Sequence, residues 1–361
     1  MHIPFCEKKC FYCSFVVSVG QQHRMDSYLD CLAKEAKQYK GAKVKTIYIG
    51  GGTPTFMNNQ QIEKLITIGR KNFNFDNDVE FTMEANPEGL DRTKAKLLKD
   101  LGINRVSVGM QSLNDKYLKF LGRCHDRQQA VRAFANLREA GHDNINLDLM
   151  YSFPGQTDEE IEEDVRGIAQ LGSEHLSLYT LTIEEHSRFY VQKLKLEEDC
   201  QAEHYVLVTE LLNQYGFQQY EVSNFAKMSR QSLHNLNYWM GGNYIGLGVG
   251  AHSHRDGKRW WNVSRLNLYM QRIDDHERVI ENCETLTEHQ RLLEAMLLGL
   301  RMNQGIKIKE IEQSIGCLLE EDKRKMINEF VREGFMIWEG DSLRINLKGR
   351  LVLDELCSRL I

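Results

Sequence analysis

The stretch Val44–Pro54, VKTIYIGGGTP, decides how this chain can fold. Its β-branched and aromatic residues predict a buried strand, which ends in three glycines, a threonine and a proline. The residues that follow, 60–71, carry apolar side chains at helical spacing. A strand that ends on glycine and leads into an amphipathic helix is typical of a parallel sheet.

The same unit recurs along the first half of the chain. Strand patterns occupy 78–87, 104–112, 144–157 and 175–187. The helical patterns between them end on glycines that suit left-handed C-caps, namely Gly102, Gly141 and Gly172. Because crossovers between parallel strands are right-handed, five such units plus a first strand ahead of them predict an α/β fold, a partial (β/α)6 barrel of the TIM type.

Proline and polar residues mark the carboxyl ends of these strands. The chain has four prolines, and each follows closely on a strand pattern, where no ladder hydrogen bond is needed: Pro4, Pro54, Pro87 and Pro154. Polar side chains gather at the same ends: Thr53, Glu84, Asn86, Gln111 and Asp148. Since barrels bind ligands at this face, these residues predict a binding site there.

Three cysteines precede the first helix in a C-x3-C-x2-C run: Cys6, Cys10 and Cys13. Structural zinc takes a closed set of four ligands, and no second cysteine pair is present. Three thiolates would instead leave one iron of a [4Fe–4S] cluster open to a small molecule. The other six cysteines lack ligand spacing, and we expect them to be small buried side chains: Cys31, Cys124, Cys200, Cys283, Cys317 and Cys357.

Composition restricts the partners and the compartment. A net charge of −5 gives no electrostatic basis for binding nucleic acid. No run approaches the roughly 18 apolar residues of a membrane span, and no signal peptide opens the chain. We therefore expect a cytoplasmic protein whose cysteines bind metal rather than form disulfides. The composition is compatible with a homodimer and with a peripheral membrane contact.

The cysteine run, with Tyr12 before its last member, resembles the signature of the radical S-adenosylmethionine (SAM) superfamily. The surrounding HIPFC is similar to the branch that contains oxygen-independent coproporphyrinogen III oxidase and the HemW-type haem chaperones. The resemblance implies that the cluster's open iron is chelated by SAM. It further implies that the cofactors are contacted by Tyr12, Gly51, Gly52, Thr53, Glu84, Gln111, Arg123 and Asp148. Among these, the glycines and Thr53 would contact the amino group of SAM, and Asp148 would bind a ribose hydroxyl.

Two departures bear on function. The oxidases of this branch carry a fourth cysteine at the position where this chain has Phe15. The HemW group lacks that cysteine and carries the motif H-N-x-x-Y-W, which is present here as HNLNYW at 234–239. The motif offers an imidazole beside aromatic faces, so the resemblance implies that His234 ligates haem, with His252 and His254 as weaker candidates.

The resemblance therefore favours a haem chaperone that delivers haem to apo-proteins such as respiratory cytochromes. The alternative is the oxidase, which decarboxylates coproporphyrinogen III to protoporphyrinogen IX. We expect haem carriage rather than catalysis, with SAM cleavage left open.

The first strand is short. Relatives begin x-x-Y-I-H-I-P-F-C, whereas here Met1 directly precedes His2. We expect the genomic sequence upstream of Met1 to encode a few more residues in frame, with a tyrosine two positions before His2.

From about residue 281 the pattern changes to helices at 287–306, 307–316 and 320–335, followed by a hairpin with a turn at Gly340–Asp341. This predicts a small, mostly helical, winged-helix-like domain. Its 15 acidic residues outnumber its 12 basic ones, which disfavours DNA binding, so we expect it to pack on the barrel or cover the site. The expected division is a radical SAM core at 1–225, a connecting region at 226–280 and a C-terminal domain at 281–361.

Overall fold

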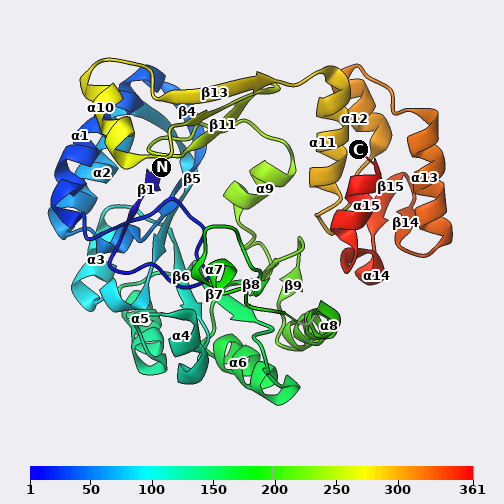
Figure 1. Ribbon diagram of the computed structural model, residues 1–361, viewed down its shortest axis with the longest axis horizontal. Helices are drawn as coiled ribbons and strands as arrows, with labels where there is room; N and C mark the ends of the chain where they lie inside the picture. The colour runs from blue at the N-terminus through cyan, green and yellow to red at the C-terminus, as the bar shows by residue number, and fades with distance from the viewer. Residues whose placement is uncertain (197, 361) are drawn as a thin grey trace.

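The computed structural model describes residues 1–196 and 198–360. Its main sheet has eight strands, and the first six in its order are parallel and curve into an open barrel (Figure 1). In sheet order these six are β1 (His2–Ile3), β4 (Ala42–Gly51), β5 (Phe73–Ala85), β6 (Arg105–Gln111), β7 (Ile145–Tyr151) and β8 (His175–Thr180). Antiparallel β10 (Asn224–Ala226) and β9 (Gln218–Gln219) continue the sheet beyond β8. The predicted partial barrel is confirmed.

Helices connect the parallel strands and cover the outside of the barrel (Figure 1). They are α1 (Met25–Ala36), α2 (Asn59–Asn72), α3 (Arg92–Asp100), α4 (Asp115–Leu121), α5 (Arg127–Glu139) and α6 (Asp158–Gln170). Two further helices, α7 (Arg188–Val191) and α8 (Glu198–Gln214), follow β8 and precede β9. Short 3-10 turns lie at Gln22–Arg24, Lys37–Tyr39, Pro54–Phe56 and Pro87–Gly89, and two-residue strands β2 (Phe5–Cys6) and β3 (Ser18–Val19) flank the cysteine loop. Gly102, Gly141 and Gly172 have the positive φ expected after α3, α5 and α6.

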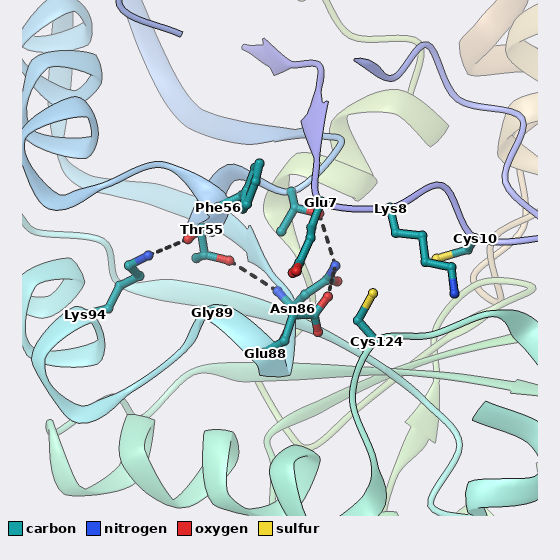
Figure 2. Close-up of a pocket in the computed structure, with 11 residues that line it drawn as sticks. Glu7, Lys8, Cys10, Thr55, Phe56, Asn86, Glu88, Gly89, Lys94 and Cys124 are labelled. Carbon is teal, nitrogen blue, oxygen red and sulfur yellow. Dashed lines mark hydrogen bonds between the residues drawn. The ribbon is translucent and has the colours of Figure 1, made fainter. Parts of the chain in front are cut away.

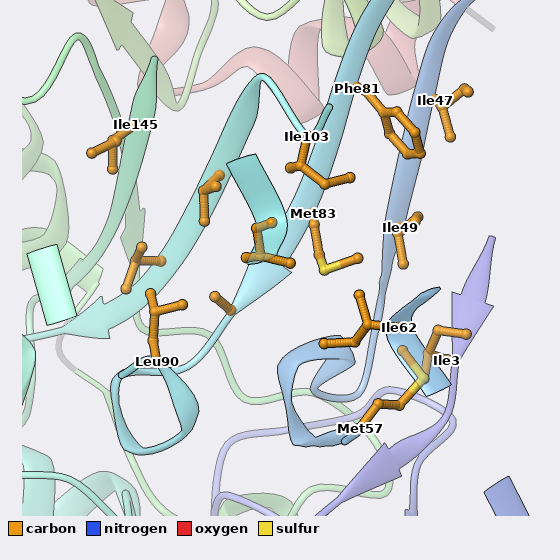
Figure 3. Close-up of a cluster of buried hydrophobic side chains, with 14 of the residues drawn as sticks. Ile3, Ile47, Ile49, Met57, Ile62, Phe81, Met83, Leu90, Ile103 and Ile145 are labelled. Carbon is orange, nitrogen blue, oxygen red and sulfur yellow. The ribbon is translucent and has the colours of Figure 1, made fainter. Parts of the chain in front are cut away.

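The two faces of the barrel strands differ in character. Side chains such as Ile49 and Met83 point outward and pack under the helices in a large apolar cluster (Figure 3). The alternate positions are polar and hydrogen-bond to one another across strands, as Asn146 does with Ser107 and His175. Because side chains alternate along a strand, the barrel has an apolar outer layer and a polar interior.

A connecting segment leads from the barrel to the C-terminal domain. It holds the short helix α9 (Leu233–Trp239), α10 (Leu266–Asp274), and an antiparallel sheet of β11 (His252–Arg255), β12 (Lys258–Asn262) and β13 (Ile280–Thr285). In Figure 1 this sheet reaches from the barrel toward α11, and α9 lies between the two domains.

The C-terminal domain has its own apolar core. It contains α11 (Glu288–Gly299), α12 (Ile308–Ile315), α13 (Glu321–Arg332), the hairpin β14 (Met336–Glu339) with β15 (Ser342–Ile345), α14 (Leu347–Arg350) and α15 (Leu353–Leu360). The three helices and the hairpin agree with the prediction, while α14 and α15 were not predicted. The domain contacts the barrel at β9, where the side-chain amide of Asn303 donates to the backbone carbonyl of Gln219 at 2.5 Å.

The prediction that the six other cysteines are buried is wrong for most of them. Cys31 and Cys357 are buried, whereas Cys200 and Cys317 are only half-buried. Cys124 is exposed because it lies on the loop after Arg123, and Cys283 is exposed because every residue of β13 is exposed.

Within the described residues, no helix combines the length and apolarity needed to cross a bilayer.

Candidate functional site

The cysteine loop is anchored to the barrel by Phe11. The Phe11 amide donates to the Leu121 carbonyl at 2.9 Å, and its ring lies edge-on to Phe189 with 6.2 Å between centroids. The guanidinium of Arg188 covers the Phe11 ring at 4.1 Å. A Cβ atom added at Gly122 would lie 2.8 Å from the same ring, so this position must be glycine. These contacts fix the loop against α4 and α7.

The three thiols of the loop are half-buried and lie beside polar groups of the strand ends. The Cys6 Sγ is 3.5 Å from the Thr53 hydroxyl, and Arg123 donates from a guanidinium nitrogen to the Cys10 Sγ at 3.5 Å. Burial raises the pKa of Cys6 to about 11 and also raises the pKa of Cys13. The thiol forms of Cys6 and Cys13 are therefore favoured, and a bound metal centre would be needed to hold these two side chains as thiolates.

The donor set fits an iron–sulfur cluster better than a single ion. In the described part of the chain, no three His, Cys, Asp or Glu side chains are close enough to hold one metal ion. The thiolates of a cubane bind different irons, so they stand farther apart than the ligands of a zinc ion. Cys6, Cys10 and Cys13 lie half-buried on one loop, and each could bind a different iron of such a cluster.

Glu84 organises the glycine-rich end of β4. Its carboxylate accepts from the Gly51 amide at 3.0 Å and from the Tyr48 hydroxyl at 2.7 Å. A Cβ atom at Gly50 would lie 2.7 Å from that carboxylate, so the close approach requires glycine. Burial raises the pKa of Glu84, although both hydrogen bonds favour its charged form.

Arg123 joins three strand ends at the barrel mouth. Its terminal nitrogen donates to the Asn86 side-chain oxygen at 2.9 Å and to the Gly109 carbonyl at 2.7 Å. Asn86 in turn donates to the Thr53 hydroxyl at 3.1 Å. Gln111 follows Gly109 with φ +68, at an irregularity in the pairing of β6 with β7. Such a break in the ladder redirects a side chain toward the mouth.

A cavity of about 230 Å³ opens beside the cysteine loop. Figure 2 shows that Cys10, Asn86, Glu88 and Cys124 point into it. Its far wall is held by Lys94, whose amine donates to the Thr55 carbonyl (Figure 2). The cavity thus lies where the predicted SAM contacts meet the predicted cluster ligands.

Asp148 lies deeper, inside the barrel. Its carboxylate accepts from the Asn146 amide at 2.7 Å and from the Ser107 hydroxyl at 3.4 Å. Burial, and then the nearby Glu84 charge, raise the pKa of Asp148 to about 7. Tyr12 packs at the mouth in the aromatic cluster around Phe153, and burial raises the pKa of its hydroxyl.

His234 does not join this group. Its Nδ1 is 2.7 Å from the hydroxyl of Thr46, in the middle of β4, whereas the other residues gather at the strand ends. The Tyr48 ring stacks on the imidazole at 5.0 Å and 20°, and Nε2 is 3.1 Å from the Tyr238 hydroxyl. Burial lowers the pKa of His234 to about 3, so the imidazole is neutral and chemically able to ligate iron.

Tyr48 links the two groups, because its ring stacks on His234 while its hydroxyl donates to Glu84.

The two weaker candidates for a haem ligand lie farther along the chain. His252 is exposed and stacks on Trp261 at 5.8 Å, and both ring nitrogens of His254 meet backbone groups.

The polar lining of the barrel interior was not predicted from the sequence. Arg105 is almost fully buried at the start of β6, and its Nε has no hydrogen-bond partner in the described part of the chain. Asn146 and His175 belong to the same lining. The signal was present, since polar residues alternate with apolar ones in NRVSVGM, NINLDLM and HLSLYT.

Comparisons with known proteins agree with this geometry. The radical SAM superfamily matches residues 1–168, and the HemN C-terminal domain matches residues 286–352. The heme chaperone HemW of Lactococcus lactis is 34% identical over 353 residues, which cover 96% of this chain and 93% of that protein. The heme chaperone HemW of Bacillus subtilis is 35% identical over 366 residues, which cover 98% of this chain and 96% of that protein. Among solved structures, coproporphyrinogen III oxidase (HemN) from Escherichia coli superposes with a TM-score of 0.88 at 26% identity, covering 99% of this chain and 88% of that one.

Proposed function

This chain belongs to the HemW family within the radical SAM superfamily, and we propose that it is a haem chaperone that binds haem and delivers it to apo-proteins of the respiratory chain. In this proposal it carries a [4Fe–4S] cluster, binds SAM and works in the cytoplasm.

The observation that carries the proposal is the setting of His234 on α9. Among residues 1–196 and 198–360, its Nε2 has a single partner, the hydroxyl of Tyr238, a residue that is 38% exposed. Leu233 and Met240, at the two ends of the helix, are 52% and 61% exposed. A neutral imidazole beside exposed apolar side chains suits a haem macrocycle, which needs an axial nitrogen and apolar surface. Ligation through Nε2 requires only that the Tyr238 side chain move away.

Cys6, Cys10 and Cys13 would hold the cluster, which supplies an electron at low potential when bound. Arg123 positions the loop through Cys10, and it also keeps Asn86 and the Gly109 carbonyl in place. The groups available to SAM are the polar side chains and backbone of the barrel mouth: Gly51, Gly52, Thr53, Glu84, Gln111 and Asp148.

The alternative function is coproporphyrinogen III oxidation, which the likeness to the Escherichia coli oxidase favours. Against it stands Phe15, which is 66% exposed at the position of the oxidases' fourth cysteine. An exposed phenyl ring cannot replace a thiolate as a metal ligand.

Haemin titration tests the chaperone proposal. We expect the protein to give a sharp Soret band, and His234→Ala to weaken or shift it, because the axial nitrogen is lost. His252→Ala tests the weaker candidate and should leave the band unchanged, since His252 is exposed and stacks on Trp261. A Soret band that is the same in wild type and His234→Ala would contradict the ligand assignment.

Turnover separates the two functions. The anaerobic, cluster-loaded protein should not convert coproporphyrinogen III when SAM and a low-potential reductant are supplied. Conversion at about 1 per second or faster, in the range of ordinary enzymes, would establish the oxidase instead.

A further inference from the structure

A second cavity, of about 320 Å³, lies between α9 and the C-terminal domain. One wall is the end of α9 with the chain that follows it, and a second is the turn between β11 and β12. The remaining walls come from α11 and α12. In Figure 1, α9 and α11 face each other across this region.

The cavity shares a residue with the proposed haem ligand. Tyr238 lines the cavity, and its hydroxyl is the partner of His234 Nε2. If that side chain swings aside, the cavity and the imidazole become continuous. The apolar part of the lining suits the edge of a macrocycle and comprises Met240, Leu286, Ala295, Leu298 and Ile315.

The charges around the cavity leave one cation without a partner. Glu294 forms an ion pair with Arg259. Asp256 accepts from the Asn243 amide at 2.9 Å and lies 3.6 Å from the Arg255 guanidinium. Arg291 lines the same cavity, yet within the described residues its side chain makes no ion pair and no hydrogen bond.

His254 adds no free charge to the cavity. Its Nε2 accepts from the Gly257 amide at 3.3 Å, which requires an unprotonated nitrogen there. The cavity therefore combines apolar walls with one unpaired guanidinium, a fork that binds a carboxylate through two parallel hydrogen bonds.

We propose that this cavity seats one edge of haem and that Arg291 binds a haem propionate. The inference rests on the proposed haem-binding function and adds the C-terminal domain to the site. A volume of about 320 Å³ is at the low end of the roughly 300–1,000 Å³ of small-molecule sites, so the cavity holds part of the macrocycle. The other edge stays outside, where an acceptor protein can reach it.

Haemin and haemin dimethyl ester, whose propionates carry no charge, are the two probes. We expect Arg291→Met to weaken haemin binding roughly tenfold, the effect of losing one charge-assisted contact. The same variant should bind the ester as wild type does. Arg291→Lys should lie between wild type and Arg291→Met in haemin affinity, because lysine keeps the charge but loses the bidentate fork. Arg332→Met is the matched control, because Arg332 lies on α13, is 74% exposed and does not line the cavity.

Equal haemin affinities of Arg291→Met and wild type would overturn the inference, as would an equal loss for haemin and for the ester. If haem binding depends on His234 but not on Arg291, this inference fails alone. If wild type binds no haem, the proposed function and this inference fail together.

Discussion

At the scale of single residues, the three thiols of the cysteine loop differ from Cys124 in burial and in how they are held. Cys124 lines the same cavity as Cys10, yet it is exposed and lies outside the loop that Phe11 anchors. Sharing a cavity does not make Cys124 a ligand, because a cluster ligand must be held in place by its own loop.

We therefore predict that Cys6→Ala, Cys10→Ala and Cys13→Ala each abolish the cluster. The wild type should take up about four irons per chain on anaerobic reconstitution, with broad visible absorbance. Cys124→Ala should reconstitute normally. Loss of iron in Cys124→Ala, with retention in a loop variant, would show that the ligand set is different.

Asp164 is a buried acid with a structural role. Its carboxylate accepts from the Ser112 hydroxyl at 2.5 Å and from the Leu113 amide at 2.8 Å, and it thereby holds the segment after Gln111 against α6. Burial raises the pKa of Asp164 to about 6. The folded state therefore holds this proton more tightly than the unfolded chain does, and the stabilisation is complete at low pH and lost as the pH rises toward 6.

The free energy of unfolding of Asp164→Asn relative to wild type tests this. As the pH rises from about 4 to about 7, wild type should lose roughly 1–3 kcal/mol relative to the variant, because a shift of one pKa unit corresponds to about 1.4 kcal/mol. Denaturant unfolding at both pH values measures the difference. A constant difference would mean that Asp164 is not protonated in the folded protein at low pH.

At the scale of elements, α9 is held to the barrel by Glu80. The buried carboxylate of Glu80 accepts from the amides of Leu233 and His234, each at 2.9 Å, and from the Ser232 hydroxyl at 3.3 Å. The first amides of a helix have no partner within it, and a carboxylate satisfies them and interacts favourably with the helix dipole. Glu80 of β5 therefore holds the first turn of the proposed haem helix, while Thr46 and Tyr48 of β4 contact His234.

We predict that Glu80→Ala lowers the free energy of unfolding by about 1–3 kcal/mol, the cost of leaving buried donors unsatisfied. It should also weaken haem binding, because His234 is no longer held in place. Glu80→Gln keeps an acceptor oxygen and should lie between Ala and wild type in both measurements. If Glu80→Ala unfolds like wild type in denaturant, Glu80 does not cap α9.

At the scale of the whole molecule, two separate apolar cores meet at a polar junction. Arg350 donates to the Asn303 side-chain oxygen at 2.5 Å, and the Asn303 amide donates to the Tyr220 carbonyl at 2.9 Å. Arg301 lies 5.5 Å from the centre of the Trp239 ring, which links α9 to the same domain. Polar junctions of this kind allow domains to move relative to each other.

We predict that Arg350→Ala loosens the C-terminal domain. Limited proteolysis should cut the segment between β13 and α11 faster, while each domain stays folded. Haem affinity should also fall, because the second cavity lies between the domains. Arg332→Ala, on the exposed face of α13, is the control. If both variants are cut at the same rate, the junction does not hold the domain.

The sequence by itself determined the barrel, the cysteine loop and the polar strand ends. Each is a local signal: a strand–helix alternation, three cysteines within the eight residues from Cys6 to Cys13, or a polar residue at the end of an apolar strand. Because parallel strands bring their carboxyl ends to one edge, local positions such as Thr53 and Glu84 were enough to predict that these residues meet.

Only the tertiary structure decided where the HNLNYW motif lies and what surrounds it. Thr46 and His234 are 188 positions apart and hydrogen-bond to each other, and no periodic pattern in the sequence encodes that pairing. The same holds for the cavity that joins Tyr238 to Arg291, since its walls come from three segments that meet only after the two domains have packed. Contacts between distant segments depend on how preformed elements fit together, which local periodicity cannot specify.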